Sequence, residues 1–133
     1  MRILKYIFIS LIFTLSTQTT AFSQNENDLP RGLIISFKQG NSIGLSEYFG
    51  DRVELSIQDK EAIYSKSQAK QIMAKFFREY TPSDFRKKHI GGKPGARYVI
   101  GDLITNRGNF RINFLLKEQN GKFVVHQLHI EKD

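Results

Sequence analysis

The chain has 133 residues, of which 20 are Lys or Arg and 13 are Asp or Glu, so its formal net charge is +7. It contains no cysteine, which excludes disulfides, thiol nucleophiles, cysteine-bound zinc and iron–sulfur clusters. A charge of this size is ordinary for a solvated protein surface and does not by itself indicate a nucleic-acid partner.

The first 23 residues are predicted to be a cleaved signal peptide. Arg2 and Lys5 form a short basic region, and an almost entirely apolar run follows at 6–15. Ala21 and Ser23 are small residues that fit the site of a signal peptidase. The apolar run is shorter than the roughly twenty residues that a membrane span needs.

The remaining chain, residues 24–133, is long enough for one domain with a single modest core. Export by the signal peptide implies that this domain is periplasmic or secreted. We expect it to keep no integral membrane segment after cleavage. Because an exported domain rarely meets nucleic acid, we expect no nucleic-acid partner.

Two helices are predicted at the start of this domain. Asp28 is a favourable N-cap with Pro30 in the first turn, and apolar residues then recur at helical spacing until Gly40. Ser42 can cap a second, short helix, which Gly50 closes.

A half-buried strand is predicted next, because Val53, Leu55 and Ile57 alternate with polar residues. A turn at 59–60 leads to a second short strand at 62–64.

The clearest predicted element is a long helix. Ser65 and Gln68 have the spacing of a capping box, and Thr81-Pro82 stops the helix. One face of the helix is apolar, as expected for a helix that packs on a core. This face carries Ala69, Ile72, Met73, Phe76, Phe77 and Tyr80.

The last third of the chain has the alternation and the turns of an antiparallel meander. Strands are predicted at 84–90, 97–105, 109–118 and 122–131, with turns at Asn106-Arg107-Gly108 and Asn120-Gly121.

The order of these elements resembles the nuclear transport factor 2-like superfamily, which includes ketosteroid isomerase-like and polyketide cyclase-like proteins. SFKQGNSIGLSEYFGDRVELSI, YSKSQAKQIMAKFFREY and GKFVVHQLHIEKD are similar to its opening, its central helix and its last strand. FFREYTPSDFRKKHIGG and ARYVIGDLITNRGNFRI resemble, more narrowly, a family of small exported bacterial proteins of unknown function. The resemblance implies an α+β, cone-shaped fold, in which N-terminal helices and one long helix pack on a curved, mostly antiparallel β-sheet.

A pocket inside this implied cone is expected from the register of the two strands that flank Asn106-Arg107-Gly108. A three-residue loop with Gly108 in the left-handed region pairs residue 102 with residue 112, whereas a two-residue loop would force Arg107 to positive φ. The interior face would then consist of Tyr98, Ile100, Asp102, Ile104, Phe110, Ile112, Phe114 and Leu116.

Asp102 is the exception on this otherwise apolar face, and it is a weak candidate for a catalytic residue. A carboxyl group in an apolar site can act as a general base or as a hydrogen-bond donor. The alternative is that Asp102 lies near the end of the sheet, hydrated or paired with an arginine. No catalytic residue of ketosteroid isomerase-like enzymes can be carried over onto a matching motif here.

The last strand leaves two registers open. A two-residue Asn120-Gly121 turn places the odd-numbered residues of 123–129 beside Phe114, whereas a bulge at Gly121 places the even-numbered residues of 124–130 there. In either register, one of the two histidines of this strand faces the interior. We therefore expect a ligand to contact Phe76, Tyr98, Asp102, Phe110, Phe114, His126 and His129.

Metal binding is not expected. His89, His126 and His129 are distributed over two predicted strands and have no carboxylate at ligand spacing along the chain. The sequence also contains no cofactor motif, so we expect no cofactor.

The segment FRKKHIGGKPGARY, residues 85–98, is rich in Lys, Arg and Gly. It lacks the Gly-Lys-Ser/Thr ending of a phosphate-binding loop, and a strand follows it instead of a helix. We interpret it as a long hairpin loop at the rim of the cone. Its cations form a candidate anion-binding rim, which consists of Lys87, Lys88, Lys93 and Arg97.

These observations favour an exported, non-catalytic domain that binds a small apolar or amphipathic ligand or a protein partner. Two alternatives remain open: a small isomerase- or cyclase-like enzyme with Asp102 as general base, and a structural, dimeric envelope protein. A homodimer that forms through the outer sheet face is expected. An interior filled by aromatic side chains would leave no room for a substrate and would exclude the enzyme.

Overall fold

The computed structural model describes residues 29–133. The predicted signal peptide and the predicted cap Asp28 lie outside the described residues. Within 29–133, no helix combines the length and the apolar character that a membrane span requires. In chain order, the elements are α2 (Arg31–Gln39), α3 (Ser42–Ser46), β1 (Phe49–Ile57), β2 (Lys60–Ser65), α4 (Lys66–Glu79), β3 (Pro82–Lys93), β4 (Ala96–Thr105), β5 (Gly108–Gln119) and β6 (Lys122–Lys132).

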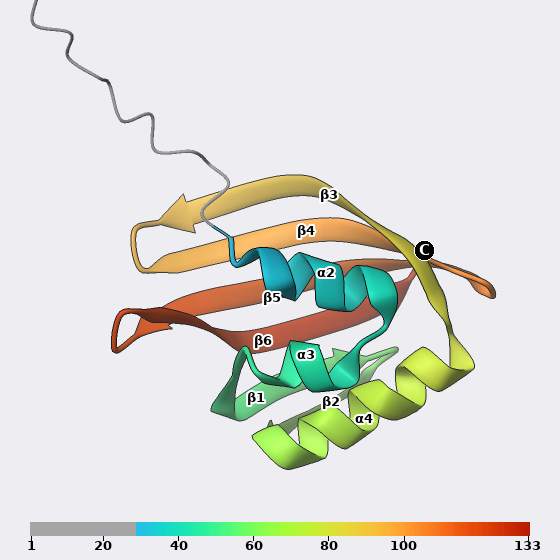
Figure 1. The fold of residues 1–133 in the computed structure, drawn as a ribbon, viewed down its shortest axis with the longest axis horizontal. Coiled ribbons are helices and arrows are strands. Elements are labelled where there is room, and N and C mark those ends of the chain that lie inside the picture. Colours follow the sequence, from blue (N-terminus) through green and yellow to red (C-terminus); the bar gives the residue numbers. More distant parts are fainter. Residues whose placement is uncertain (1–28) are drawn as a thin grey trace, which may run out of the picture.

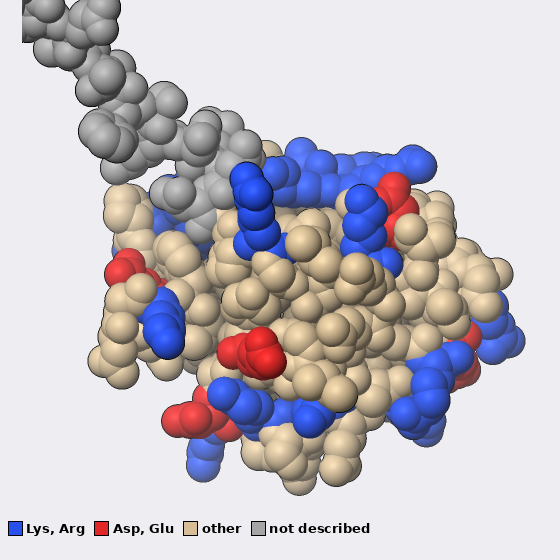
Figure 2. Space-filling model, viewed as in Figure 1, with Lys and Arg blue, Asp and Glu red and all other residues tan. Residues whose placement is uncertain are grey.

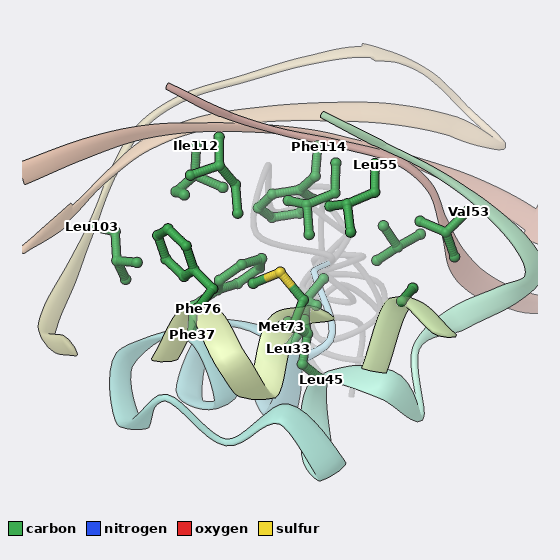
Figure 3. Close-up of a cluster of buried hydrophobic side chains, with 14 of the residues drawn as sticks. Leu33, Phe37, Leu45, Val53, Leu55, Met73, Phe76, Leu103, Ile112 and Phe114 are labelled. Atoms are coloured by element: carbon green, nitrogen blue, oxygen red, sulfur yellow. The ribbon is translucent and has the colours of Figure 1, made fainter. Parts of the chain in front are cut away.

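The six strands form one curved sheet in the order β2-β1-β6-β5-β4-β3 (Figure 1). All neighbouring strands are antiparallel except β1 and β6, which pair in parallel. The three helices cover one face of the sheet, called the inner face here, and the core lies between the two layers (Figure 3). The opposite face is called the outer face, and none of the helices within residues 29–133 covers it. β2 and β3 are the edge strands.

The space between helices and sheet is filled by large apolar side chains. Phe37 of α2 stacks between two aromatic rings of the sheet, with centroid distances of 5.4 Å to Phe85 and 5.4 Å to Phe114. Phe76 of α4 packs edge-on against Phe110 at 5.1 Å. All five rings are buried, and offset or edge-on ring pairs of this kind contribute roughly 0.5–1.5 kcal/mol beyond their buried area.

Local sequence signals determine the long helix. The capping box is confirmed, because Ser65 Oγ accepts the Gln68 N–H at 3.2 Å and Gln68 Oε1 accepts the Ser65 N–H at 3.1 Å. The predicted cap of the short helix was wrong by one residue: Asn41 Oδ1 accepts the Gly44 N–H, and Ser42 is the first helical residue. Pro30 takes the N-cap position of α2.

The predicted register of the β4–β5 hairpin is wrong. Thr105 pairs with Gly108, so that the turn contains two residues, and Asp102 pairs with Arg111 rather than with residue 112. Gly108 has a positive φ of +112°, whereas the φ of Arg107 is not positive. The Thr105 hydroxyl closes the turn, because it accepts the Arg107 N–H and donates to the Gly108 carbonyl.

This register inverts the faces of β4. Val99 and Leu103 are fully buried on the inner face, and successive strand residues point to opposite faces. The expected interior residues of β4 therefore lie on the outer face, whereas those of β5 lie in the core as expected. The four misplaced residues are Tyr98, Ile100, Asp102 and Ile104.

The β5–β6 hairpin combines both registers that the sequence left open. The turn has two residues, with φ of 52° at Asn120 and 77° at Gly121, and Val125 faces the core opposite Leu116. A bulge between this pair and the Leu115–Gln127 pair then shifts the strand by one residue. Beyond the bulge, Leu128 and Ile130 face the core.

Candidate functional site

A ligand-binding pocket was expected in the interior beneath the helices, but core side chains fill this space. Phe76, Phe110 and Phe114, three of the residues expected to contact a ligand, are 5%, 0% and 2% exposed. The space that is open to solvent lies elsewhere, in a groove beside α4 and in a shallow hollow on the outer face.

The groove runs between α4 and the inner side of β1 and β2 and has a volume of about 370 Å³. α4 contributes one wall through residues next to its buried stripe, and the β1–β2 hairpin contributes the other. A second hollow, lined by Tyr64, Gln68, Gln71, Ile72 and Lys75, continues along the same side of α4. The groove is lined by Leu55, Ile57, Gln58, Lys60, Tyr64, Ile72, Lys75, Phe76, Glu79 and Tyr80.

The groove is amphipathic. Its apolar surface comes from buried or half-buried side chains such as Leu55, Ile72 and Phe76. The ammonium-bearing side chains of Lys60 and Lys75 are exposed at its border, together with one carboxylate, Glu79. A cationic border over an apolar surface suits a ligand that has an apolar body and an anionic end.

Tyr80, which lines the groove, is part of an aromatic pair. The Tyr80 ring packs against the Phe110 ring at 4.7 Å and carries the Arg107 guanidinium 5.7 Å from its centroid. This contact connects the groove to the β4–β5 turn.

The outer-face hollow has a volume of about 210 Å³ and lies over β4, β5 and β6. The structure places Tyr98, Ile100 and His129, which were expected in the interior, at this hollow. Tyr98 is 42% exposed, and its hydroxyl lies 3.3 Å from His89 Nε2. The expected homodimer through this face stays a prediction.

Asp102 lies away from any described cavity. Its Oδ2 atom is 2.6 Å from Lys88 Nζ, and its cross-strand neighbours are Arg86 and Arg111. The expected interior placement is therefore wrong. The alternative of a carboxylate paired with a cation is the one that the structure favours, with lysine in place of arginine.

A cluster of Glu54, Glu61 and His129 lies on the outer face across β1, β2 and β6. His129 Nε2 is 3.8 Å from Glu54 Oε1. The pKa of Glu54 is lowered, first by a hydrogen bond with Glu61 and then by the Gln127 amide, which donates to Glu54 Oε2 at 2.6 Å. The pKa of Glu61 is raised, first by the same hydrogen bond and then by the negative charge of Glu54.

Strand pairing brings the carboxylates of Glu54 and Glu61 close to His129, which spacing along the chain could not reveal. His129 alternates with the core residues Leu128 and Ile130 and lies on the outer face, so its expected contact with a ligand in the interior is wrong. His126 occupies the bulge of β6 and is half-buried.

The basic segment is an edge strand with a short turn. β3 continues to Lys93, which pairs with Ala96, so the expected long loop is reduced to Pro94-Gly95. Figure 2 shows Lys and Arg side chains gathered along the edge over β3. Charged edge strands resist pairing with other chains. Of the four cations expected at an anion-binding rim, Lys88 is already engaged by Asp102.

Sequence reasoning identified the stripe of α4 but missed the groove beside it. The groove depends on side chains of the β1–β2 hairpin, such as Lys60 and Tyr64, whose inner-face position follows from the turn at Gln58-Asp59. The sequence predicted that turn one residue later. Both turn residues have positive φ, 47° and 72°. Because neither is glycine, the turn lacks the Asn-Gly or Asp-Gly pattern by which such turns are usually predicted.

The chain is similar to a family without an assigned activity. Residues 31–131 match the model of a family described as a domain of unknown function (DUF4783). A crystal structure of a protein of that family from Bacteroides uniformis is 40% identical, with a TM-score of 0.76, over 80% of this chain and 98% of that chain. No curated protein matches the sequence.

Two more distant structures share the fold alone. A designed NTF2 protein is 15% identical with a TM-score of 0.61, over 74% of this chain and 90% of that one. A proposed polyketide cyclase from Sinorhizobium meliloti is 10% identical with a TM-score of 0.61, over 80% of this chain and 98% of that one. The resemblance to the nuclear transport factor 2-like fold is confirmed at this level.

Proposed function

Because this chain belongs to the DUF4783 family, whose fold is nuclear transport factor 2-like, we propose that it is an exported, non-catalytic domain that holds a small amphipathic anion in the groove beside α4. The observation that carries this proposal is the groove itself. It combines an apolar surface with two exposed ammonium groups in a fold whose interior is otherwise closed.

The size of the groove supports a small ligand. Its volume of about 370 Å³ lies near the lower end of the roughly 300–1,000 Å³ that ligand pockets span. An alkyl or ring body would contact Leu55, Ile72 and Phe76, and an anionic end would lie near Lys60 and Lys75. Glu79 on the same border disfavours a ligand with several negative charges.

The enzyme alternative loses its candidate base. Asp102 is held by Lys88 on the outer face, on the other side of the sheet from the groove. Aromatic side chains fill the interior, since Phe76, Phe77, Phe110 and Phe114 are all buried. The groove itself is lined by one carboxylate, Glu79, which is exposed to solvent.

Export is supported by the sequence of residues 1–23 alone. A fractionation experiment tests it: the full chain expressed in a Gram-negative host should appear in the periplasm as a shorter species whose mass corresponds to loss of residues 1–23. A full-length chain that stays in the cytoplasm would contradict this part of the proposal.

Calorimetric titration with decanoate, a single-chain carboxylate, tests the binding function. We expect saturable binding that the charge reversal Lys75→Glu weakens about three- to tenfold, because one favourable charge contact becomes a repulsive one. The matched control is Arg78→Glu, which reverses an exposed cation of α4 outside the groove and should leave the affinity within about twofold. Equal losses in both variants would show only a general charge effect and would contradict a site in the groove.

A further inference from the structure

Three side chains with metal-ligating atoms surround Ser56 on the outer face. Glu61 of β2 and His129 of β6 are the direct cross-strand partners of Ser56, and Glu54 lies two residues earlier on the same face of β1. One ligand atom from each of these three side chains lies within 4.8 Å of the other two. We propose that Glu54, Glu61 and His129 form a binding site for a divalent transition-metal cation such as Zn²⁺.

The spacing is close to what coordination needs. A tetrahedral zinc ion with bonds of about 2.0–2.2 Å to oxygen and nitrogen separates neighbouring ligand atoms by about 3.4 Å. His129 Nε2 and Glu54 Oε1 are 3.8 Å apart, and all three ligand atoms lie within 4.8 Å of one another, so side-chain movements on the order of an ångström would bring them to coordination distance. The backbone of three paired strands holds the ligands, and rotamer adjustments can supply these movements.

Two buried polar atoms, one in the cluster and one on the neighbouring strand, have no hydrogen-bond partner among the described residues. Although 36% of the His129 side chain is exposed, its Nε2 atom is buried and, among the described residues, has no hydrogen-bond partner. The same holds for Oδ1 of Asn113, which pairs with His129 across β5 and β6. Buried polar atoms without partners are uncommon in native proteins, and a cation bound to Nε2 would satisfy His129.

Gln127 orients one of the proposed ligands, and the outer-face hollow leaves one side of the proposed site open. The Gln127 amide donates to Glu54 Oε2 at 2.6 Å, which orients that carboxylate as an outer-shell partner does. His129 and Gln127 also line the outer-face hollow of about 210 Å³. With three protein ligands, the cation keeps at least one coordination position for water or for a small ligand in this hollow.

The ligand set selects the class of cation. Two carboxylates and one imidazole suit Zn²⁺, Mn²⁺, Fe²⁺ or Co²⁺ better than Ca²⁺ or Mg²⁺, which prefer oxygen ligands alone. The chain contains no cysteine, so a thiolate cannot compete for the ion. A site with three ligands at an exposed sheet face is expected to bind reversibly.

The test is a calorimetric titration of the metal-free protein with Zn²⁺, repeated with Co²⁺ while its visible absorption is recorded. We expect one equivalent of Zn²⁺ per chain and, for Co²⁺, new visible bands from a nitrogen-containing site. Glu61→Gln and His129→Gln should each weaken Zn²⁺ binding about tenfold or more, since loss of an outer partner alone costs about 10–100-fold. His126→Gln, at the neighbouring histidine outside the cluster, should change it less than about threefold.

Each contrary result overturns the site. Absence of saturable Zn²⁺ binding would show that the cluster is a hydrogen-bonded carboxyl pair with a histidine beside it. Retention of full affinity by His129→Gln, or an equal loss in His126→Gln, would place the ion elsewhere. Thermal melting without metal checks that the variants fold. If His129→Gln does not fold, Glu61→Gln decides, because Glu61 is fully on the surface of an edge strand.

Discussion

Lys88 Nζ lies 2.6 Å from Asp102 Oδ2, and this contact ties the edge strand β3 to β4 on the outer face. The Asp102 side chain is 12% exposed, whereas that of Lys88 is 60% exposed. Lys88 sits where the β3–β4 ladder shifts by one residue between Lys87 and His89. The bulge therefore places an ammonium group over a nearly buried carboxylate.

Removal of the Lys88 charge should destabilise the fold, because it leaves the Asp102 carboxylate in a poorly hydrated position. Lys88→Met is expected to lower the free energy of unfolding by about 1–2 kcal/mol, between the values for exposed and buried ion pairs. Urea denaturation measures this change. Lys93→Met, at the exposed end of the same strand, is the control and should stay within about 0.5 kcal/mol. Equal effects would mean that the contact contributes nothing.

A side chain at Gly101 should clash with the core. A Cβ atom there would lie 2.5 Å from Phe85 Cζ and 2.8 Å from the Arg86 carbonyl oxygen. Gly101→Ala is therefore expected to cost about 1–3 kcal/mol as an overpacked site. Gly50→Ala is the matched control, since its Cβ would meet nothing closer than 3.5 Å. Thermal melts in which both variants match the original protein would contradict the packing of Phe85 over β4.

Truncation of Phe37 should be the most damaging change among these predictions. Its ring is fully buried and lies between Phe85 and Phe114, at interplanar angles of 21° and 22°. Phe37→Ala is expected to cost about 3–5 kcal/mol in urea denaturation, from lost transfer free energy and a cavity. Ile43→Ala removes a side chain that is 62% exposed and should change stability by less than about 0.5 kcal/mol. A small effect at Phe37 would contradict the filled interior.

The contribution of Asp84 should depend on pH. Its pKa is lowered, first by the Phe85 N–H, which donates to Oδ1 at 2.9 Å, and then by Lys38 and Arg86. A folded pKa below the unfolded value of about 3.9 means that ionised Asp84 stabilises the fold above that pH. This stabilisation is lost as pH falls through the folded pKa.

Asp84→Asn should therefore lower the melting temperature at pH 7, and the difference from the original protein should shrink as the pH drops below about 4. Asp51→Asn, an exposed change on β1, controls for the loss of one negative charge. A difference at Asp84 that stays constant down to pH 2 would contradict the lowered pKa.

Local signals account for most elements of this fold. The capping box at Ser65 and the Asn120-Gly121 turn are short-range patterns with one dominant geometry, and the structure contains both. The β4–β5 register failed for a physical reason. β4 is apolar on both faces, with Val99 beside Ile100 and Leu103 beside Ile104. The hydrophobic pattern therefore could not select one face.

The side chain of Thr105 made the two-residue turn possible by bonding within it. That interaction leaves no pattern that separates this turn from a three-residue loop. A two-residue turn was expected to force Arg107 to positive φ, whereas Gly108 has the positive φ in the structure.

Sites that combine residues of several strands could not be predicted from the sequence. Glu54 and His129 meet because β1 pairs in parallel with β6, the last strand of the chain. The groove likewise needs α4 and the β1–β2 hairpin to converge. Spacing along the chain predicts neither the contact between Glu54 and His129 nor the groove. It was sufficient to predict the apolar stripe of α4, because that stripe lies within one helix.

The measurement that tests the central claim most directly is a ¹H–¹⁵N correlation spectrum of the protein, recorded during titration with decanoate. The groove proposal expects amide shifts that saturate and that cluster at Tyr64, Ile72 and Lys75. Shifts confined to the outer face around Tyr98 and Leu115, or no saturable shifts at all, would contradict it.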